Sequence, residues 1–121
     1  MAIIAKARFI RMSPSKGKGL VLEIQGKPVE DAFAILKLSK KKSSIYIRKV
    51  LASAVANAQN NPKLRAGKEK IETSDLYVKR AMIDGGPTLQ RIKHRAMGRV
   101  FRIRKRTSHI AIELGLINEK V

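Results

Sequence analysis

The chain has 121 residues, which suits a single domain with a modest core. Lysine and arginine number 27 against 9 acidic residues, and the net charge of +18 makes a polyanionic partner the natural expectation. With no cysteine and no run of about 18 apolar residues, the chain excludes disulfides, cysteine-based metal sites and a membrane-spanning helix.

The first expected element is a strand over residues 3–10. Its side chains alternate between an expected inner face and a cationic outer face: Ala5, Ala7 and Phe9 against Lys6, Arg8 and Ile10. Because the apolar run precedes the cations, the order is wrong for a secretory signal, and we expect a cytoplasmic protein.

Three helices are expected next. The first begins at Ser13-Pro14, an N-cap followed by proline at the first helical position, and ends at Gly26. The second begins at Pro28, and the third, over about residues 43–60, keeps the longest unbroken helical period. Their apolar stripes are Leu20, Val21 and Ile24, then Val29, Ala32, Phe33 and Leu36, then Ile47, Val50, Leu51, Ala54, Val55 and Ala58. Between the last two helices, Lys40–Lys42 fits a solvated junction as well as a binding patch.

A polar loop over residues 63–70 precedes a return to strands. In the next strand, residues 72–84, the two faces are expected to be Leu76, Val78 and Met82 against Tyr77, Lys79, Ala81 and Ile83. A last strand over residues 107–114 would point Ile110, Ile112 and Leu114 to the core. The order of elements predicts an α+β fold, with three helices packed on a small three-stranded antiparallel sheet.

Between these strands, residues 85–106 predict a long, protruding, basic β-hairpin. Gly85-Gly86-Pro87 marks the exit from the body, since a phosphate loop would need a lysine and a following helix. Arms of about ten residues around a turn near His94–Gly98 would reach about 30 Å. The hairpin's cations are Arg91, Lys93, Arg95, Arg99, Arg102, Arg104, Lys105 and Arg106. We expect one domain, 1–121, made of a globular body, 1–84 and 107–116, and this hairpin.

The residue types favour RNA binding over catalysis. His94 and His109 lie in basic sequence with no acid placed to orient them, and we expect no metal and no cofactor. Arginine, which dominates the hairpin, matches phosphate bidentately and stacks on bases. With Phe101 alone for stacking and Gln90 alone for reading base edges, recognition should depend on phosphate and RNA shape. A free regulatory DNA- or RNA-binding module is the alternative reading of these residues.

Three segments resemble the bacterial type of large-subunit ribosomal protein number twenty-two: SPSKGKGLVLEIQGK, KVLASAVANAQNN and GPTLQRIKHRAMGRVFRIRKRTSHI. The resemblance covers about residues 5–114, although His94 stands where the family usually has proline. It implies three helices on a three-stranded sheet with a long hairpin. It also implies a non-enzymatic constituent of the large ribosomal subunit that binds its ribosomal RNA, aids assembly and lines the peptide exit tunnel with the hairpin.

The partners implied are large-subunit ribosomal RNA, neighbouring ribosomal proteins and the nascent peptide, with no membrane and no homo-oligomer. The residues expected to bind RNA are Lys6, Arg8, Arg11, Lys16, Lys18, Arg91, Arg95, Arg99, Arg102, Arg104, Lys105 and Arg106. The tunnel-lining tip would be Lys93, His94, Arg95, Ala96, Met97 and Gly98.

Overall fold

A computed structural model describes residues 3–60, 72–94 and 96–117, so the loop expected over residues 63–70 lies outside the described residues. The elements are β1 (Ile3–Ile10), α1 (Pro14–Ile24), α2 (Val29–Leu38), α3 (Ser43–Asn60), β2 (Leu76–Gly85), β3 (Leu89–His94), β4 (Val100–Lys105) and β5 (Ser108–Leu116), with single 3-10 turns at Thr73–Asp75 and Ala96–Gly98. None of the helices in these ranges is both long and apolar enough to span a bilayer.

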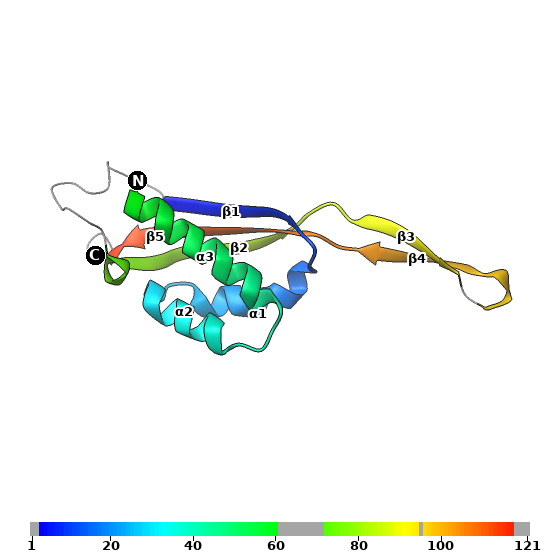
Figure 1. Ribbon diagram of the computed structural model, residues 1–121, viewed down its shortest axis with the longest axis horizontal. Coiled ribbons are helices and arrows are strands. Elements are labelled where there is room, and N and C mark those ends of the chain that lie inside the picture. The colour runs from blue at the N-terminus through cyan, green and yellow to red at the C-terminus, as the bar shows by residue number, and fades with distance from the viewer. Residues whose placement is uncertain (1–2, 61–71, 95, 118–121) are drawn as a thin grey trace.

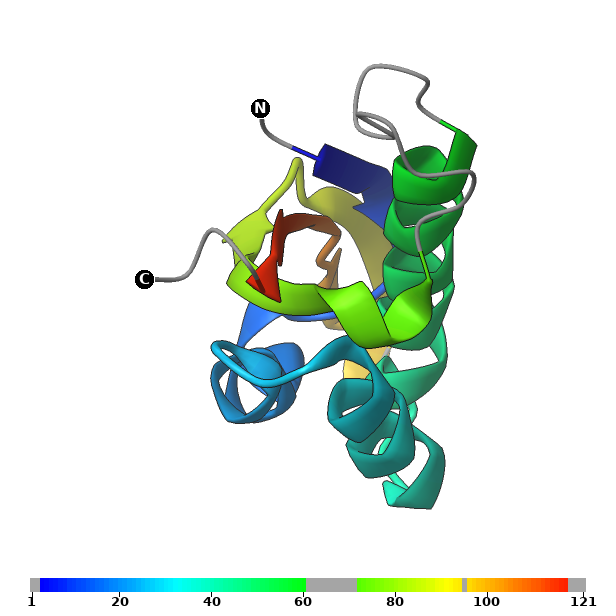
Figure 2. The ribbon, with the colours of Figure 1, turned by 90° about the vertical axis from the view of Figure 1, so that its left-hand side faces the viewer.

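The described strands form one three-stranded sheet and one separate ribbon. The sheet has the order β1-β5-β2 and is antiparallel throughout, whereas β3 pairs with β4 alone. The three helices lie on one side of the sheet, where α3 packs against β1 and β5 and α1 packs against β2 (Figure 2). The predicted α+β fold, with its three helices, three-stranded sheet and basic hairpin, is confirmed.

The core is aliphatic and lies between the helices and the inner face of the sheet. Every side chain predicted for the apolar stripes of the helices is buried, except Phe33, which is partly buried at the edge of the core. The inward residues of the last strand are confirmed as well: Ile110, Ile112 and Leu114 are fully enclosed. Gly26, at the predicted end of α1, has φ +83 and donates its N–H to the Val78 carbonyl oxygen at 2.7 Å. A left-handed residue therefore links α1 to the sheet.

The prediction that Phe9 faces inward is wrong, because β1 contains a β-bulge. Ala7 pairs with Ile110 and Ile10 pairs with Ser108, so that Arg8 and Phe9 together oppose His109. An extra residue in one strand reverses the faces beyond it. Ile10 consequently packs against the core, while the side chain of Phe9 is 61% exposed.

The strand β2 carries a second bulge, and the prediction for its far half is wrong for the same reason. The register with β5 shifts between Val78 and Arg80. Beyond the shift, Ala81 and Ile83 are buried and Met82 is 41% exposed, the reverse of the expected faces. The strand also begins later than expected, because Thr73–Asp75 forms a 3-10 turn.

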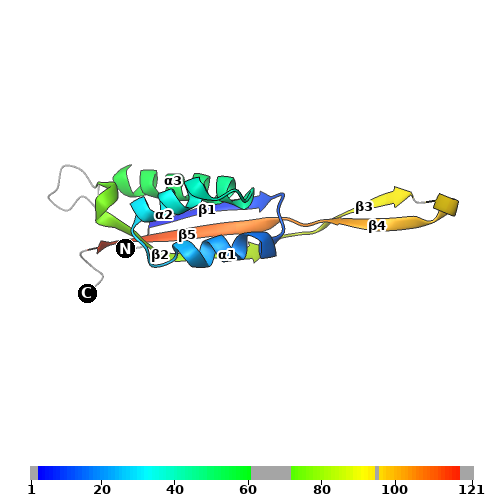
Figure 3. The same ribbon diagram turned by 90° about the horizontal axis from the view of Figure 1, so that it is seen from below.

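The hairpin formed by β3 and β4 extends from one end of the body, nearly in line with the sheet (Figures 1 and 3). Its ladder runs from the pair Leu89 and Lys105 to the pair His94 and Val100, six residues an arm instead of about ten. The paired part therefore spans about 20 Å. The paired ladder is shorter than the expected arms because Gly86, Pro87 and Thr88 lie between the end of β2 and the start of β3.

Candidate nucleic-acid interface

Three hydrogen bonds fix the point where the hairpin meets the body. Thr107 Oγ1 donates to the Pro87 carbonyl oxygen at 2.6 Å, and the Gly86 N–H donates to the Thr107 carbonyl oxygen at 2.9 Å. The hydroxyl of Ser108, fully buried, donates to the carbonyl oxygen of Met12 in the turn after β1. The two arms are thus tied to each other and to the body, and this sets the direction of the hairpin.

Cations from three distant segments meet beside this junction. Two hollows, of about 500 and 360 Å³, share Arg11, Met12, Lys16 and Lys42 in their linings. The first continues to Ser15, Lys41 and Ser43, and the second to Ser13, Arg104, Lys105 and Arg106. We call this joint surface the basal groove. It brings together five of the predicted RNA-binding residues: Arg11, Lys16, Arg104, Lys105 and Arg106.

The start of α3 is held against α1. This packing brings Lys41 and Lys42, which precede α3, into the basal groove. Ser43 Oγ donates to the Lys16 carbonyl oxygen at 3.4 Å, and Ser44 Oγ donates to the Lys41 carbonyl oxygen at 2.6 Å. Sequence reasoning left Lys40–Lys42 open between a solvated junction and a binding patch, because only the tertiary packing brings Lys41 and Lys42 beside Lys16. Lys18, also predicted, is exposed on α1 but lines neither hollow.

The cations of the hairpin lack acidic partners within the described ranges. The ion pair found there joins Lys79 Nζ to Glu113 Oε1 at 3.8 Å, on the body. Arg91, Arg99, Arg102, Arg104, Lys105 and Arg106 are all exposed. Exposed cations on a thin ribbon repel one another, and a polyanion bound along it would remove that repulsion.

The predicted tip is a tight, exposed turn. Met97, with φ 66, and Gly98, with φ +74, are consecutive left-handed residues that reverse the chain between β3 and β4. Lys93 and His94 are exposed at the end of β3, and the side chain of Met97 is 94% exposed. Arg95 lies outside the described residues.

Lys6 and Arg8, also predicted to bind RNA, lie elsewhere. They line a third hollow, of about 350 Å³, with Phe9, Met82, Asp84, His109, Ile110 and Ala111. Asp84 is the register partner of His109 across β2 and β5, so an acidic residue does stand opposite this histidine. The group that His109 Nδ1 binds is the Phe9 N–H. This hollow shares no lining residue with the basal groove.

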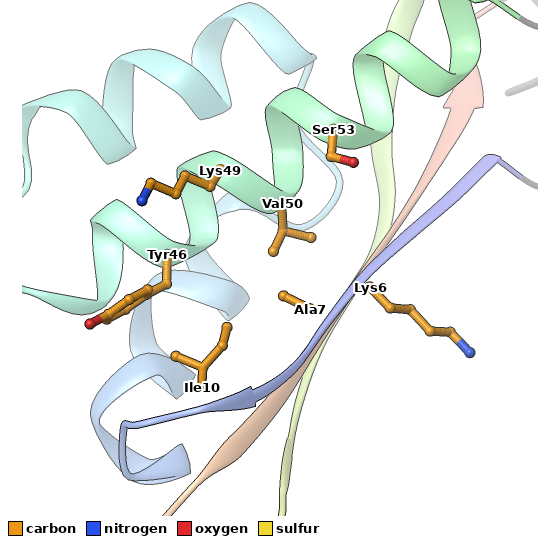
Figure 4. Close-up of a pocket in the computed structure, with 7 residues that line it drawn as sticks. All are labelled: Lys6, Ala7, Ile10, Tyr46, Lys49, Val50 and Ser53. Carbon is orange, nitrogen blue, oxygen red and sulfur yellow. The ribbon is translucent and has the colours of Figure 1, made fainter.

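A crevice of about 270 Å³ between β1 and α3 gathers few cations. Ala7, Ile10, Tyr46 and Val50 face this space, whereas Lys6 leaves β1 on the opposite side (Figure 4). Its apolar lining is that of a strand and helix packed at the edge of the core. Across the described ranges, no three histidine or acidic side chains gather as metal ligands would.

Comparison with known proteins agrees with this arrangement. The family described as ribosomal protein L22p/L17e matches residues 5–115. The large ribosomal subunit protein uL22 of Carboxydothermus hydrogenoformans is 48% identical over 108 residues, 89% of either chain, and that of Desulfitobacterium hafniense is 49% identical over the same shares. The protein of that name from Halothermothrix orenii is 45% identical over 116 residues, 96% of this chain and 94% of its own. The chain therefore belongs to the ribosomal protein L22p/L17e family.

Proposed function

We propose that this chain binds large-subunit ribosomal RNA through the basal groove and the hairpin, aids the assembly of that RNA, and lines the peptide exit tunnel with the hairpin tip. Membership of a ribosomal protein family makes the chain a structural constituent of the ribosome and not an enzyme. As such it acts in the cytoplasm, within the large subunit. In this proposal residues 1–84 and 107–116 form the anchored body and residues 85–106 the extension, present as one copy without a homo-oligomer.

One observation carries the RNA-binding part of this proposal. Arg104 and Lys105, at the end of β4, and Arg106, which follows them, line the basal groove together with Arg11, Lys16 and Lys42. Exposed arginines and lysines gathered at the base of the hairpin and along β4 suit the spaced phosphates of a nucleic-acid backbone. Family membership favours RNA over DNA as the source of those phosphates.

Salt dependence of binding tests the basal groove. Each phosphate contact contributes about −0.7 to −0.9 to the slope of log affinity against log salt. We expect Lys42→Gln to make the slope for large-subunit ribosomal RNA shallower by about that amount. Lys27→Gln is the matched control, because Lys27 is an exposed lysine in the turn between α1 and α2 and lines neither hollow. Wild-type binding that hardly responds to salt would contradict the proposal.

The tunnel role is tested separately at the tip. A photo-crosslinking amino acid at position 97, where the native side chain is 94% exposed, should crosslink to a nascent peptide in translating ribosomes. The same amino acid at position 38, an exposed leucine at the end of α2, is the control and should not. If position 97 crosslinks only to RNA, whatever the length of the nascent chain, the proposal that the tip contacts the nascent peptide is wrong.

Shortening the hairpin by deleting Arg91–Lys93 should leave association with the large subunit intact, because the basal groove is retained. It should change the response to drugs that bind in the tunnel or the stalling of nascent chains. Lost association with normal tunnel behaviour would contradict this division of roles.

A further inference from the structure

We propose that Phe9 and His109 form a stacking platform for one unpaired nucleobase, on the face of the sheet that the helices leave open. This inference rests on the proposed function, since the base would belong to the same ribosomal RNA. It concerns a different surface, however, because the hollow beside Phe9 shares no lining residue with the basal groove.

The backbone holds Phe9 in a conformation that phenylalanine rarely adopts. Its φ is 59, in the left-handed region where a side chain is disfavoured. The bulge lets Ile10 take the place in the core that the strand alternation would give to Phe9. Backbone strain that turns a large apolar side chain toward solvent does not serve the core, and such strain is common where a ligand is gripped.

His109 fixes the position of the exposed ring. The Phe9 N–H donates to His109 Nδ1 at 3.1 Å, which leaves the proton of a neutral imidazole on Nε2. The two rings meet edge to face, with centroids 5.0 Å apart and planes at 89°. A rigid exposed aromatic ring is the feature on which single-stranded nucleic-acid binders stack bases.

The surroundings of the two rings suit a nucleotide. Lys6 and Arg8 lie at the same hollow and can neutralise its phosphate, and Lys6 leaves β1 on the side away from α3 (Figure 4). Met82 adds an apolar surface that is 41% exposed. Asp84 lines the hollow as well, and because an ionised carboxylate only accepts hydrogen bonds, it would favour a base with amino or imino donors.

Two measurements on RNA binding, the affinity and its dependence on salt concentration, distinguish a stacking contact from a charge contact. Phe9→Leu keeps an apolar side chain but removes the ring, and we expect it to weaken binding to large-subunit ribosomal RNA by between about 5- and 150-fold. The salt slope should stay at the wild-type value, because no cation is lost. Phe9→Trp should restore the affinity. Lys6→Gln is the complementary variant, which should make the slope shallower.

Chemical probing locates the contact. Dimethyl sulfate modification of the RNA should show an unpaired adenine or cytosine, or a very small group of them, that wild-type protein protects and the Phe9→Leu variant leaves reactive, with all other protections unchanged. Identical affinity and protection for the two proteins would overturn the platform while leaving the proposed function intact. A photo-crosslink from position 9 to a neighbouring ribosomal protein instead of RNA would also overturn it. Failure of the wild-type protein to bind the RNA would instead refute the proposed function.

Discussion

Because Phe9 is 61% exposed, we expect its ring to contribute little to the free energy of unfolding. Phe9→Gly would relieve the positive φ, worth about 1 kcal/mol, and lose the edge-to-face contact with His109, worth about 0.5–1.5 kcal/mol. We expect the free energy of unfolding in urea to change by less than about 1 kcal/mol, against about 3–5 kcal/mol for loss of a buried phenylalanine. A loss in that larger range would mean that the ring is structural and would weaken the case for a binding role.

The same residue shows what strand alternation cannot reveal. The alternation of β1 and β2 predicted the correct faces up to Ala7 and Val78, and the opposite faces beyond them. A β-bulge adds one residue without any change in the types of side chain, so alternation alone could not show the reversal at Phe9 or Met82. The local indication at Phe9 was that Ile10 follows it and is a second apolar side chain of suitable size for the core.

At the scale of the elements, the junction between β2 and β3 depends on a glycine for steric reasons. A Cβ at Gly86 would lie 2.5 Å from Thr107 Oγ1 and 3.1 Å from the His109 ring. Thr107 cannot move aside without losing its bond to Pro87. We expect Gly86→Ala to lower the free energy of unfolding by about 1–3 kcal/mol, measured in urea.

Gly85 supplies the matched control for this substitution. A Cβ there meets only Pro14 Cγ, at an ordinary 3.8 Å. Gly85→Ala should therefore change the free energy of unfolding by less than about 0.5 kcal/mol. Equal effects at the two positions would show that flexibility of the chain, and not the space beside Thr107, makes glycine necessary at this junction.

The existence of the elements was largely predictable, because helical periods and turn residues are local signals. Ser13 and Gly26 indicate where α1 begins and ends, Pro28 indicates the start of α2, and the long apolar period before Asn60 indicates the extent of α3. The length of the β3–β4 ladder was not predictable from the alternation of side chains along the strands. That alternation does not show where pairing of β2 with β5 stops and pairing of β3 with β4 begins. Pairing depends on which strand lies alongside, and that is decided by tertiary packing.

At the scale of the whole molecule, a net charge of +18 should make stability sensitive to ionic strength. The Debye length falls from about 10 Å at 0.1 M salt to about 3 Å at 1 M, which screens the mutual repulsion of the cations. We expect the Tm of the isolated protein to rise as NaCl increases over this range, followed by circular dichroism. An uncharged solute at equal osmolality serves as the control, and a Tm that is constant or falls with salt would contradict the prediction.

The basal groove forms only when the whole chain folds, which explains why only part of the candidate interface could be predicted from the sequence. Charge composition and the family resemblance pointed to the cations of the hairpin, since these stand together in the sequence. Lys42 and Arg104 are separated by more than half the chain and line the same hollow only after folding. The sequence contains both residues but no local pattern that joins them.

The position of β5 has a mechanical consequence. This strand is the centre of the sheet, paired on both sides, and only Arg106 and Thr107 separate it from β4 of the hairpin. A pull at the far end of the hairpin acts on both arms, and therefore on β2 and β5 in the same direction. Because antiparallel hydrogen bonds lie perpendicular to the strands, this pull loads the ladder between β5 and β1 in shear, with all its bonds sharing the force, instead of opening them one after another.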